Sequence, residues 1–155
     1  WAISAMKDIK RLYQYHGAEH KCINCIEGGS ELNVENVKAA SKEHRRCGTS
    51  FLLYVMVISI LFFAFIDTPS RIMRVALRIV LIPVIASVSY ELIRLAGKSN
   101  NAFVRALSAP GLLMQRLTTK EPDEQMIEVG IRSVEAVFDW RAYLEENFPS
   151  GEKTK

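Results

Sequence analysis

The stretch FLLYVMVISILFFAFI, residues Phe51–Ile66, decides the fold. It contains no charged residue, and a helix wound from it is apolar on all faces. With Gly48, Thr49 and Ser50 in front of it, the stretch nearly reaches the ~20 residues that a helix needs to span the hydrocarbon of a bilayer. We therefore predict a transmembrane helix. The alternative is a buried core helix, which the uniform apolarity argues against.

A second apolar segment, Ile72–Ala96, follows the turn residues Asp67–Ser70. Together the two segments predict a transmembrane hairpin, with a kink at Pro83 in its second helix. That helix begins with three arginines on one side, where they can extend to headgroups and contact anionic lipid: Arg71, Arg74 and Arg78. Glu91 lies inside or at the edge of the span, so it needs either a partner, with Arg94 one turn away, or a function.

Basic residues flank both outer ends of the hairpin: Lys38, Lys42, Arg45 and Arg46 before it, and Arg94, Lys98 and Arg105 after it. The positive-inside rule then predicts that both flanks face the cytoplasm, in the bacterial cytoplasmic (inner) membrane. The arginines at the turn oppose this orientation. Because the basic residues follow the membrane edges, we expect the lipid bilayer as a partner and no nucleic acid. Three cysteines are too few for a secreted disulfide scaffold, which fits a reducing compartment.

The expected fold is therefore all-α: a membrane protein with a two-helix transmembrane hairpin flanked by cytoplasmic amphipathic helices. Its three parts are residues 1–48, a cytoplasmic helical segment with a histidine and cysteine cluster; residues 49–96, the hairpin; and residues 97–155, an interfacial segment with an amphipathic C-terminal helix. The chain begins at Trp1 without a signal-peptide pattern, and we expect it to be a piece of a longer protein.

Local signals divide the flanks further. A helix from residue 1 to about 27 ends at Gly28-Gly29, and Asn33 caps a short helix that runs to about Lys42. Residues 97–109 are expected to be a polar connection and residues 110–117 a short interfacial or re-entrant helix. A last helix of roughly 25 residues with one apolar stripe starts at Glu121, and this acidic helix would dock a cytoplasmic protein or another protomer.

The first helix carries the motif His16-Gly17-Ala18-Glu19-His20. Its two histidines lie one turn apart on the apolar stripe, so both imidazoles can bind one ion. The order H-x-x-E-H is that of inverzincin hydrolases, in which the glutamate is the general base and a distant acid completes the ligand set. On this interpretation His16, His20 and Glu91 bind zinc, and Glu19 is the catalytic base.

A second arrangement uses the cysteines. The pairs Cys22-x-x-Cys25 and His44-x-x-Cys47 have the spacing of a closed structural zinc site, and a mixed set of His16 or His20 with Cys25, His44 and Cys47 is also open. Such a site stabilises a small domain and performs no chemistry. The third possibility is that no metal binds, with the histidines in the core and the thiols packed as small apolar groups.

Several motifs together resemble the YqhQ-like family of bacterial membrane proteins, which are uncharacterised and predicted to be metal-dependent. The resemblance rests on YHGAEHK, HRRCGTSFLL, SYELIRLAG, PGLLMQRLTTKEPD and QMIEV, in the same order over about residues 10–137. Family members are longer at the N-terminus. The positions that match the family motifs are His16, Glu19, His20, Cys25, His44, Cys47, Glu91, Gln115, Arg116 and Glu121, whereas Cys22 falls where the family tolerates other residues.

Two functions remain open after this comparison. The first is a membrane-anchored, zinc-dependent hydrolase of the cytoplasmic face. The second is a non-enzymatic membrane scaffold or accessory subunit with a structural zinc or hydrogen-bonded core. Separately, Gln115 and Arg116 with the following threonines are candidates for binding a phosphate or lipid headgroup, the alternative being an ordinary basic patch.

Overall fold

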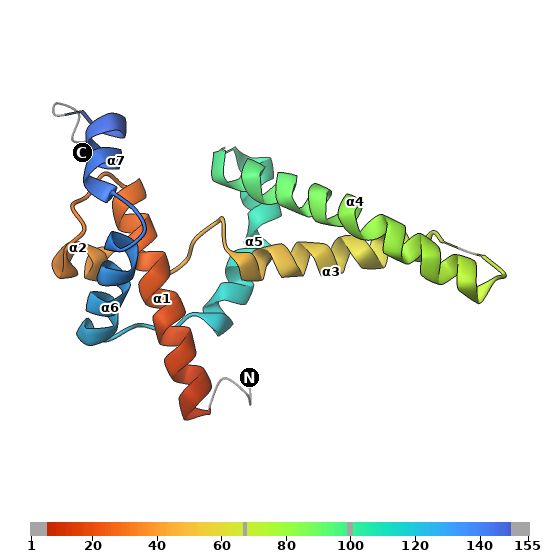
Figure 1. Cartoon of the computed structure of the whole chain (residues 1–155), viewed down its shortest axis with the longest axis horizontal. Coiled ribbons are helices and arrows are strands. Elements are labelled where there is room, and N and C mark those ends of the chain that lie inside the picture. The colour runs from red at the N-terminus through yellow and green to blue at the C-terminus, as the bar shows by residue number, and fades with distance from the viewer. Residues whose placement is uncertain (1–5, 67, 99–100, 150–155) are drawn as a thin grey trace. The chain divides into compact units, whose positions relative to one another are not determined.

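The computed structural model describes residues 6–66, 68–98 and 101–149, and over these residues the chain is all-α. This confirms the all-α part of the predicted fold. The helices, labelled in Figure 1, are α1 (Lys7–Glu27), α2 (Val34–Ala39), α3 (Gly48–Ala64), α4 (Arg71–Lys98), α5 (Ala102–Thr118), α6 (Glu124–Glu135) and α7 (Trp140–Asn147). The chain forms two compact units. The first joins both ends of the chain, up to His44 and from Arg116 onward, and the second is Arg45–Gln115.

In the first unit, α1 packs against α2 and α6, and α2 also contacts α6. The local signals in the sequence are confirmed where the structure describes them. Gly28 caps α1 and Gly29 has the left-handed φ of 76° that favours glycine. The Asn33 side chain accepts a hydrogen bond from the Asn36 N–H at the start of α2. The start predicted for the first helix, residues 1–5, lies outside the described residues.

The core of this unit lies between α1, α2, α6 and α7. It contains Cys22, Cys25, Ile26, Leu32, Val37, Ile127 and Trp140. The apolar stripe of α6 packs into this core, with Ile131 and Val134 beside the buried Ile127. The apolar stripe predicted for the last helix is thus largely covered by the chain's own helices.

The prediction of one C-terminal helix of roughly 25 residues is wrong. The helix breaks after Glu135, and α7 begins at Trp140. The Asp139 side chain accepts hydrogen bonds from the backbone N–H groups of Arg141 and Ala142, so it caps a new helix. Trp140 is buried in the core. The break therefore turns a large aromatic side chain inward, where a continuous helix would not have placed it.

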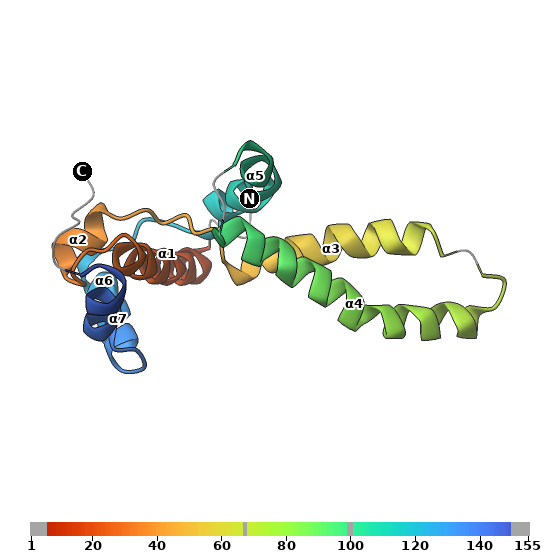
Figure 2. The ribbon, with the colours of Figure 1, turned by 90° about the horizontal axis from the view of Figure 1, so that it is seen from above.

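In the second unit, α3 and α4 lie side by side (Figures 1 and 2). Their contact is apolar and centred on Tyr54, Ile58 and Ile85. Tyr54 Oη also donates a hydrogen bond of 3.0 Å to the Leu107 carbonyl of α5. Of the helices in the described residues, α4 is long and apolar enough to cross a membrane, by length and composition. The apolar helix α3 has 17 residues and is shorter.

The division predicted for residues 97–117 is also wrong. Helix α4 continues to Lys98, and α5 begins at Ala102, well before residue 110. The Asn101 side chain accepts a hydrogen bond of 2.8 Å from the Val104 N–H and so caps the helix early. Pro110 lies inside α5, whereas the short helix was predicted to begin at this residue.

Candidate metal centre

The centre of the first unit is the middle of α1, where two segments distant in sequence contact it, one after α2 and one after α5. The Lys120 N–H donates a hydrogen bond of 2.9 Å to the Tyr13 carbonyl, and Gln14 Nε2 donates one of 3.0 Å to the Glu121 carbonyl. Gly17 faces the Lys120 carbonyl so closely that a Cβ there would overlap the oxygen. The glycine thus allows the backbone after α5 to lie against α1, beside both histidines of the H-x-x-E-H motif.

His16 and His20 lie on the face of α1 that these segments contact. His16 Nδ1 is 2.9 Å from the Thr118 carbonyl oxygen, and His20 Nδ1 is 2.7 Å from that of Lys42. A carbonyl can only accept, so in both neutral rings Nδ1 carries the proton and Nε2 the lone pair. The rings are 4.4 Å apart between centroids, and a ligand nitrogen of each lies within 4.8 Å of the other. This is the orientation that metal-binding imidazoles adopt.

His44 brings a third imidazole near His20. Its ring centroid is 5.8 Å from that of His20. Its Nε2 lies 3.2 Å from Glu27 Oε2, so in the neutral ring Nε2 donates to the carboxylate and Nδ1 carries the lone pair. His20 and His44 are both buried, and His16 is half-buried. The structure therefore gathers all three histidines of the chain within the first unit.

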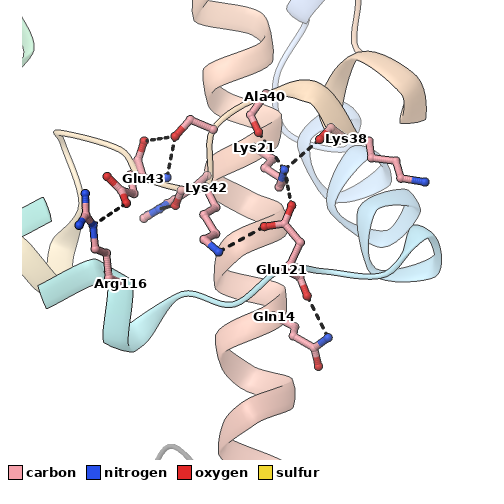
Figure 3. Close-up of polar contacts among 10 residues, drawn as sticks. Gln14, Lys21, Lys38, Ala40, Lys42, Glu43, Arg116 and Glu121 are labelled. Carbon is pink, nitrogen blue, oxygen red and sulfur yellow. Dashed lines mark hydrogen bonds and ion pairs between the residues drawn. The ribbon is translucent and has the colours of Figure 1, made fainter. Parts of the chain in front are cut away.

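Sequence reasoning missed Lys21, the most completely buried charge of this region. Its side chain is 5% exposed, and Nζ donates to the Lys38 carbonyl at 3.0 Å, to the Ala40 carbonyl at 2.8 Å and to Glu121 Oε1 at 2.7 Å (Figure 3). Lys42 Nζ reaches the other carboxylate oxygen of Glu121 at 3.4 Å. The available signal was position, since Lys21 lies one turn after Gly17 and directly between His20 and Cys22.

Glu121 therefore joins the segment before α6 to α1 by charge. Burial alone would raise the pKa of its carboxyl group. The hydrogen bond and positive charge of Lys21, and then those of Lys42, outweigh burial and lower the pKa below its ordinary value. Glu121 is one of the positions that match the motifs of the family that the sequence resembles. Its ion pairs hold the segment that carries the Thr118 carbonyl.

The thiols of Cys22 and Cys25 lie in the apolar core. Cys22 is 0% exposed, and Cys25 Sγ lies 3.4 Å from the Glu31 carbonyl. Burial, followed by the charges of Cys25 and Glu19, raises the pKa of Cys22 to about 12, and burial also raises the pKa of Cys25. Both thiols are thus held protonated, whereas metal ligation needs thiolates. Cys25 as a ligand receives no support from this environment.

The remaining candidates have the following surroundings. Glu19 is exposed on α1. Cys47 belongs to the second unit, where its Sγ is 3.2 Å from Thr49 Oγ1. Glu91 is exposed and pairs with Arg94 at 2.9 Å, as its alternative interpretation expected. Within the first unit, the described residues bring together the histidines but no carboxylate ligand from the H-x-x-E-H motif.

The two candidates for a headgroup site have different environments. Gln115 is fully buried in the second unit, and its Nε2 donates a hydrogen bond of 2.8 Å to Ser50 Oγ. Its amide therefore supports helix packing and is not presented to a headgroup. Arg116 is exposed and its Nε lies 3.1 Å from Glu43 Oε1 (Figure 3).

Comparison with known proteins places these residues in a family. The chain is 41% identical over 140 residues to "Uncharacterized protein YqhQ" of Bacillus subtilis (strain 168), a match that covers 90% of this chain and 44% of the relative. The chain thus spans less than half the length of that protein. No solved structure matches it. The family model described as "Protein of unknown function (DUF1385)" matches residues 1–140, and the chain belongs to this family, which includes the YqhQ-like proteins it was seen to resemble.

Proposed function

We propose that this chain anchors a metal centre to the bacterial cytoplasmic membrane. In this proposal α3 and α4 form a transmembrane hairpin, and the first unit lies in the cytoplasm with a zinc ion bound at His16 and His20. The observation that carries the proposal is the pair of hydrogen bonds from the two Nδ1 atoms to backbone carbonyls. They fix both rings so that the Nε2 lone pair is the one that can bind a metal, on adjacent turns of one helix.

The donor set fits zinc. Imidazole nitrogen suits zinc and other late transition metals, and His16 and His20 supply one ligand nitrogen each. His44 is the third ligand of the proposal, oriented by the Glu27 carboxylate as second-shell carboxylates orient metal-binding histidines. The nearby ammonium groups of Lys21 and Lys42 both pair with the Glu121 carboxylate.

The fourth ligand decides between a structural and a catalytic centre. Cys47 stays a prediction from its spacing to His44, three residues earlier in the sequence. With Cys47 the site would be closed and structural, whereas three histidines alone would leave an open position. The exposed position of Glu19 favours the structural role, because a general base has to lie at the reacting centre.

Replacement of zinc by Co²⁺ tests this choice. We expect the purified chain to take up one Co²⁺ and show tetrahedral ligand-field bands with thiolate-to-cobalt charge transfer. The charge-transfer band is expected to disappear in Cys47→Ser and persist in the control Cys25→Ser. Persistence of the band in Cys47→Ser would contradict Cys47 as ligand, and absence of tetrahedral bands would contradict the centre itself.

The membrane part of the proposal rests on apolar surface. Large apolar side chains are exposed along both helices of the hairpin, among them Leu52, Ile60 and Leu61 of α3 and Ile79, Val80 and Ile82 of α4. A soluble surface rarely carries so continuous an apolar patch, which in a bilayer faces lipid at no cost. At 1.5 Å per residue α3 spans roughly 25 Å, so the residues that follow it complete the crossing of ~30 Å.

Extraction of membranes at alkaline pH tests the anchor. We expect the full chain to stay with the lipid in sodium carbonate, as integral proteins do. Complete release into the supernatant would contradict the hairpin. Val80→Asp places a charge in the middle of the apolar part of α4, and we expect it to weaken retention because a central aspartate costs about 3 kcal/mol on insertion.

A further inference from the structure

The start of α4 carries positive charge where a transmembrane hairpin usually has none. Arg71, Arg74 and Arg78 follow directly on the turn between the two apolar helices. If both flanks face the cytoplasm, this turn lies on the other side of the membrane, where basic residues are normally depleted. From Gly48 to Tyr90 the sequence contains a single acid, Asp67, which lies outside the described residues. The three arginines therefore leave an excess of positive charge here, which favours binding of an external anion.

From this we propose that the start of α4 binds an anionic phospholipid, with the phosphate at the arginines and an acyl chain along α4. The inference rests on the proposed membrane insertion. At 100° per residue the three arginines fall within about 60° of one another on the helix surface, so they form one stripe. Arg71 and Arg78 are about 10.5 Å apart along the axis, which lets their long side chains converge on one headgroup.

Contacts in the second unit orient two of the guanidinium groups. Arg74 Nη2 donates a hydrogen bond of 2.7 Å to the Thr68 carbonyl. The Arg78 guanidinium lies over the Phe63 ring, with 5.0 Å from Cζ to the ring centroid. The ring and the carbonyl engage part of each guanidinium and neutralise neither charge. Arginine forms bidentate hydrogen bonds with phosphate, so the remaining N–H groups are suited to phosphate oxygens.

An apolar groove borders the arginine stripe. It has a volume of about 390 Å³ and is lined by Arg71, Ile72, Val75, Ala76 and Ile79. The apolar members lie on the side of α4 next to the stripe, and Ile72, Val75 and Ile79 are exposed. A groove with hydrocarbon walls and a guanidinium at its end matches a phospholipid, whose chain and phosphate are covalently joined. Free inorganic phosphate would use only the charged half of this surface.

Native mass spectrometry of the full chain released from detergent micelles tests the proposal. The micelles contain equimolar phosphatidylglycerol and phosphatidylcholine. We expect retained phosphatidylglycerol to exceed phosphatidylcholine about fivefold or more, since one basic residue near a membrane surface favours an anionic lipid by roughly that factor. The triple variant Arg71→Gln, Arg74→Gln and Arg78→Gln is expected to lose the preference.

The control is a second triple variant, Arg11→Gln, Arg105→Gln and Arg132→Gln, which removes the same charge from exposed positions outside the stripe. It is expected to keep the preference. Equal retention of both lipids by the unmodified chain, or equal loss in both triple variants, overturns the proposal. The second result would mean that net charge alone selects the lipid.

Two further arms test the groove and the premise. Val75→Ser with Ile79→Ser keeps the arginines, and we expect it to lower retained phosphatidylglycerol at least threefold. Glycerophosphoglycerol, the same headgroup without acyl chains, is expected not to displace the lipid at a hundredfold excess; displacement would overturn a lipid-specific site. Carbonate extraction of the parent chain separates the two proposals. If the parent chain stays in the membrane but shows no lipid preference, only this inference fails. If the parent chain is released, the anchor itself fails.

Discussion

The ammonium group of Lys21 shows how a single residue positions the proposed centre. It is buried beside His20 and has three acceptors, two of them backbone carbonyls and one the Glu121 carboxylate. A buried cation without such partners would cost several kcal/mol. Removing one partner therefore disturbs both segments whose carbonyls contact the rings of His16 and His20.

Substitution of Glu121 by Gln tests this role. We expect loss of about 1 kcal/mol of unfolding free energy, a moderate value because the carboxylate is partly exposed and screened. The measurement is denaturant unfolding at pH 7. The matched control is Glu124→Gln, which removes the carboxylate of the exposed Lys38–Glu124 pair and is expected to change stability less. Equal effects would contradict a special role for Glu121.

The same comparison has a defined pH dependence. The pKa of Glu121 is lowered in the folded chain, so its carboxylate stabilises the fold above the ordinary carboxyl pKa of about 4.3. That contribution is lost as pH falls through the lowered pKa. The difference in unfolding free energy between the parent chain and Glu121→Gln is thus expected to be full at pH 7 and to shrink below about pH 4. A difference that grows on acidification would contradict the ion pair.

Cys22 provides a second prediction for a single residue. With a pKa of about 12, its thiolate fraction at pH 8 is on the order of a thousandfold below that of an ordinary thiol. Iodoacetamide is therefore expected to alkylate Cys22 of the folded chain about a thousandfold more slowly than that of the chain in urea, as measured by peptide mass spectrometry. Comparable rates would contradict its place in the core.

At the scale of the elements, the sequence predicted what local signals specify. The apolar stripe placed His16 and His20 on one face of α1, and Gly28, Gly29 and Asn33 marked the ends of helices. The break between α6 and α7 was not predictable in this way, because it depends on burying Trp140 against distant residues. The extent of α5 was missed because a proline was taken as a boundary and the Asn101 cap was not recognised.

Gly17 tests how the segment after α5 meets α1. In Gly17→Ala the new methyl group would overlap the Lys120 carbonyl, so the segment has to move. We expect a loss of about 1–3 kcal/mol in unfolding free energy, as for overpacking, despite the higher helix propensity of alanine. The control Gly48→Ala has nothing within 4 Å of its new Cβ and is expected to be neutral or slightly stabilising. Equal stability of the two variants would contradict the close approach.

At the scale of the whole molecule, the two ends of the chain form one unit and the apolar middle forms the other. The composition of the middle was readable because it is continuous in sequence. The surroundings of the histidines were not, since the Lys42 and Thr118 carbonyls are brought to α1 by tertiary packing. The burial of both CxxC thiols depends on the same packing, because distant residues such as Val37, Ile127 and Trp140 cover them. Sequence alone identified the histidines but not the groups that orient them.

Zinc content of the purified chain tests the central claim most directly. The full chain is purified in detergent under reducing, chelator-free conditions, and its zinc is measured by inductively coupled plasma mass spectrometry. The double variant His16→Gln with His20→Gln removes the proposed ligands, and Glu124→Gln is the control. We expect one zinc per chain in the parent and the control, and less than about a tenth of that in the double variant. A parent chain without stoichiometric zinc, or a double variant that retains it, would contradict the metal centre.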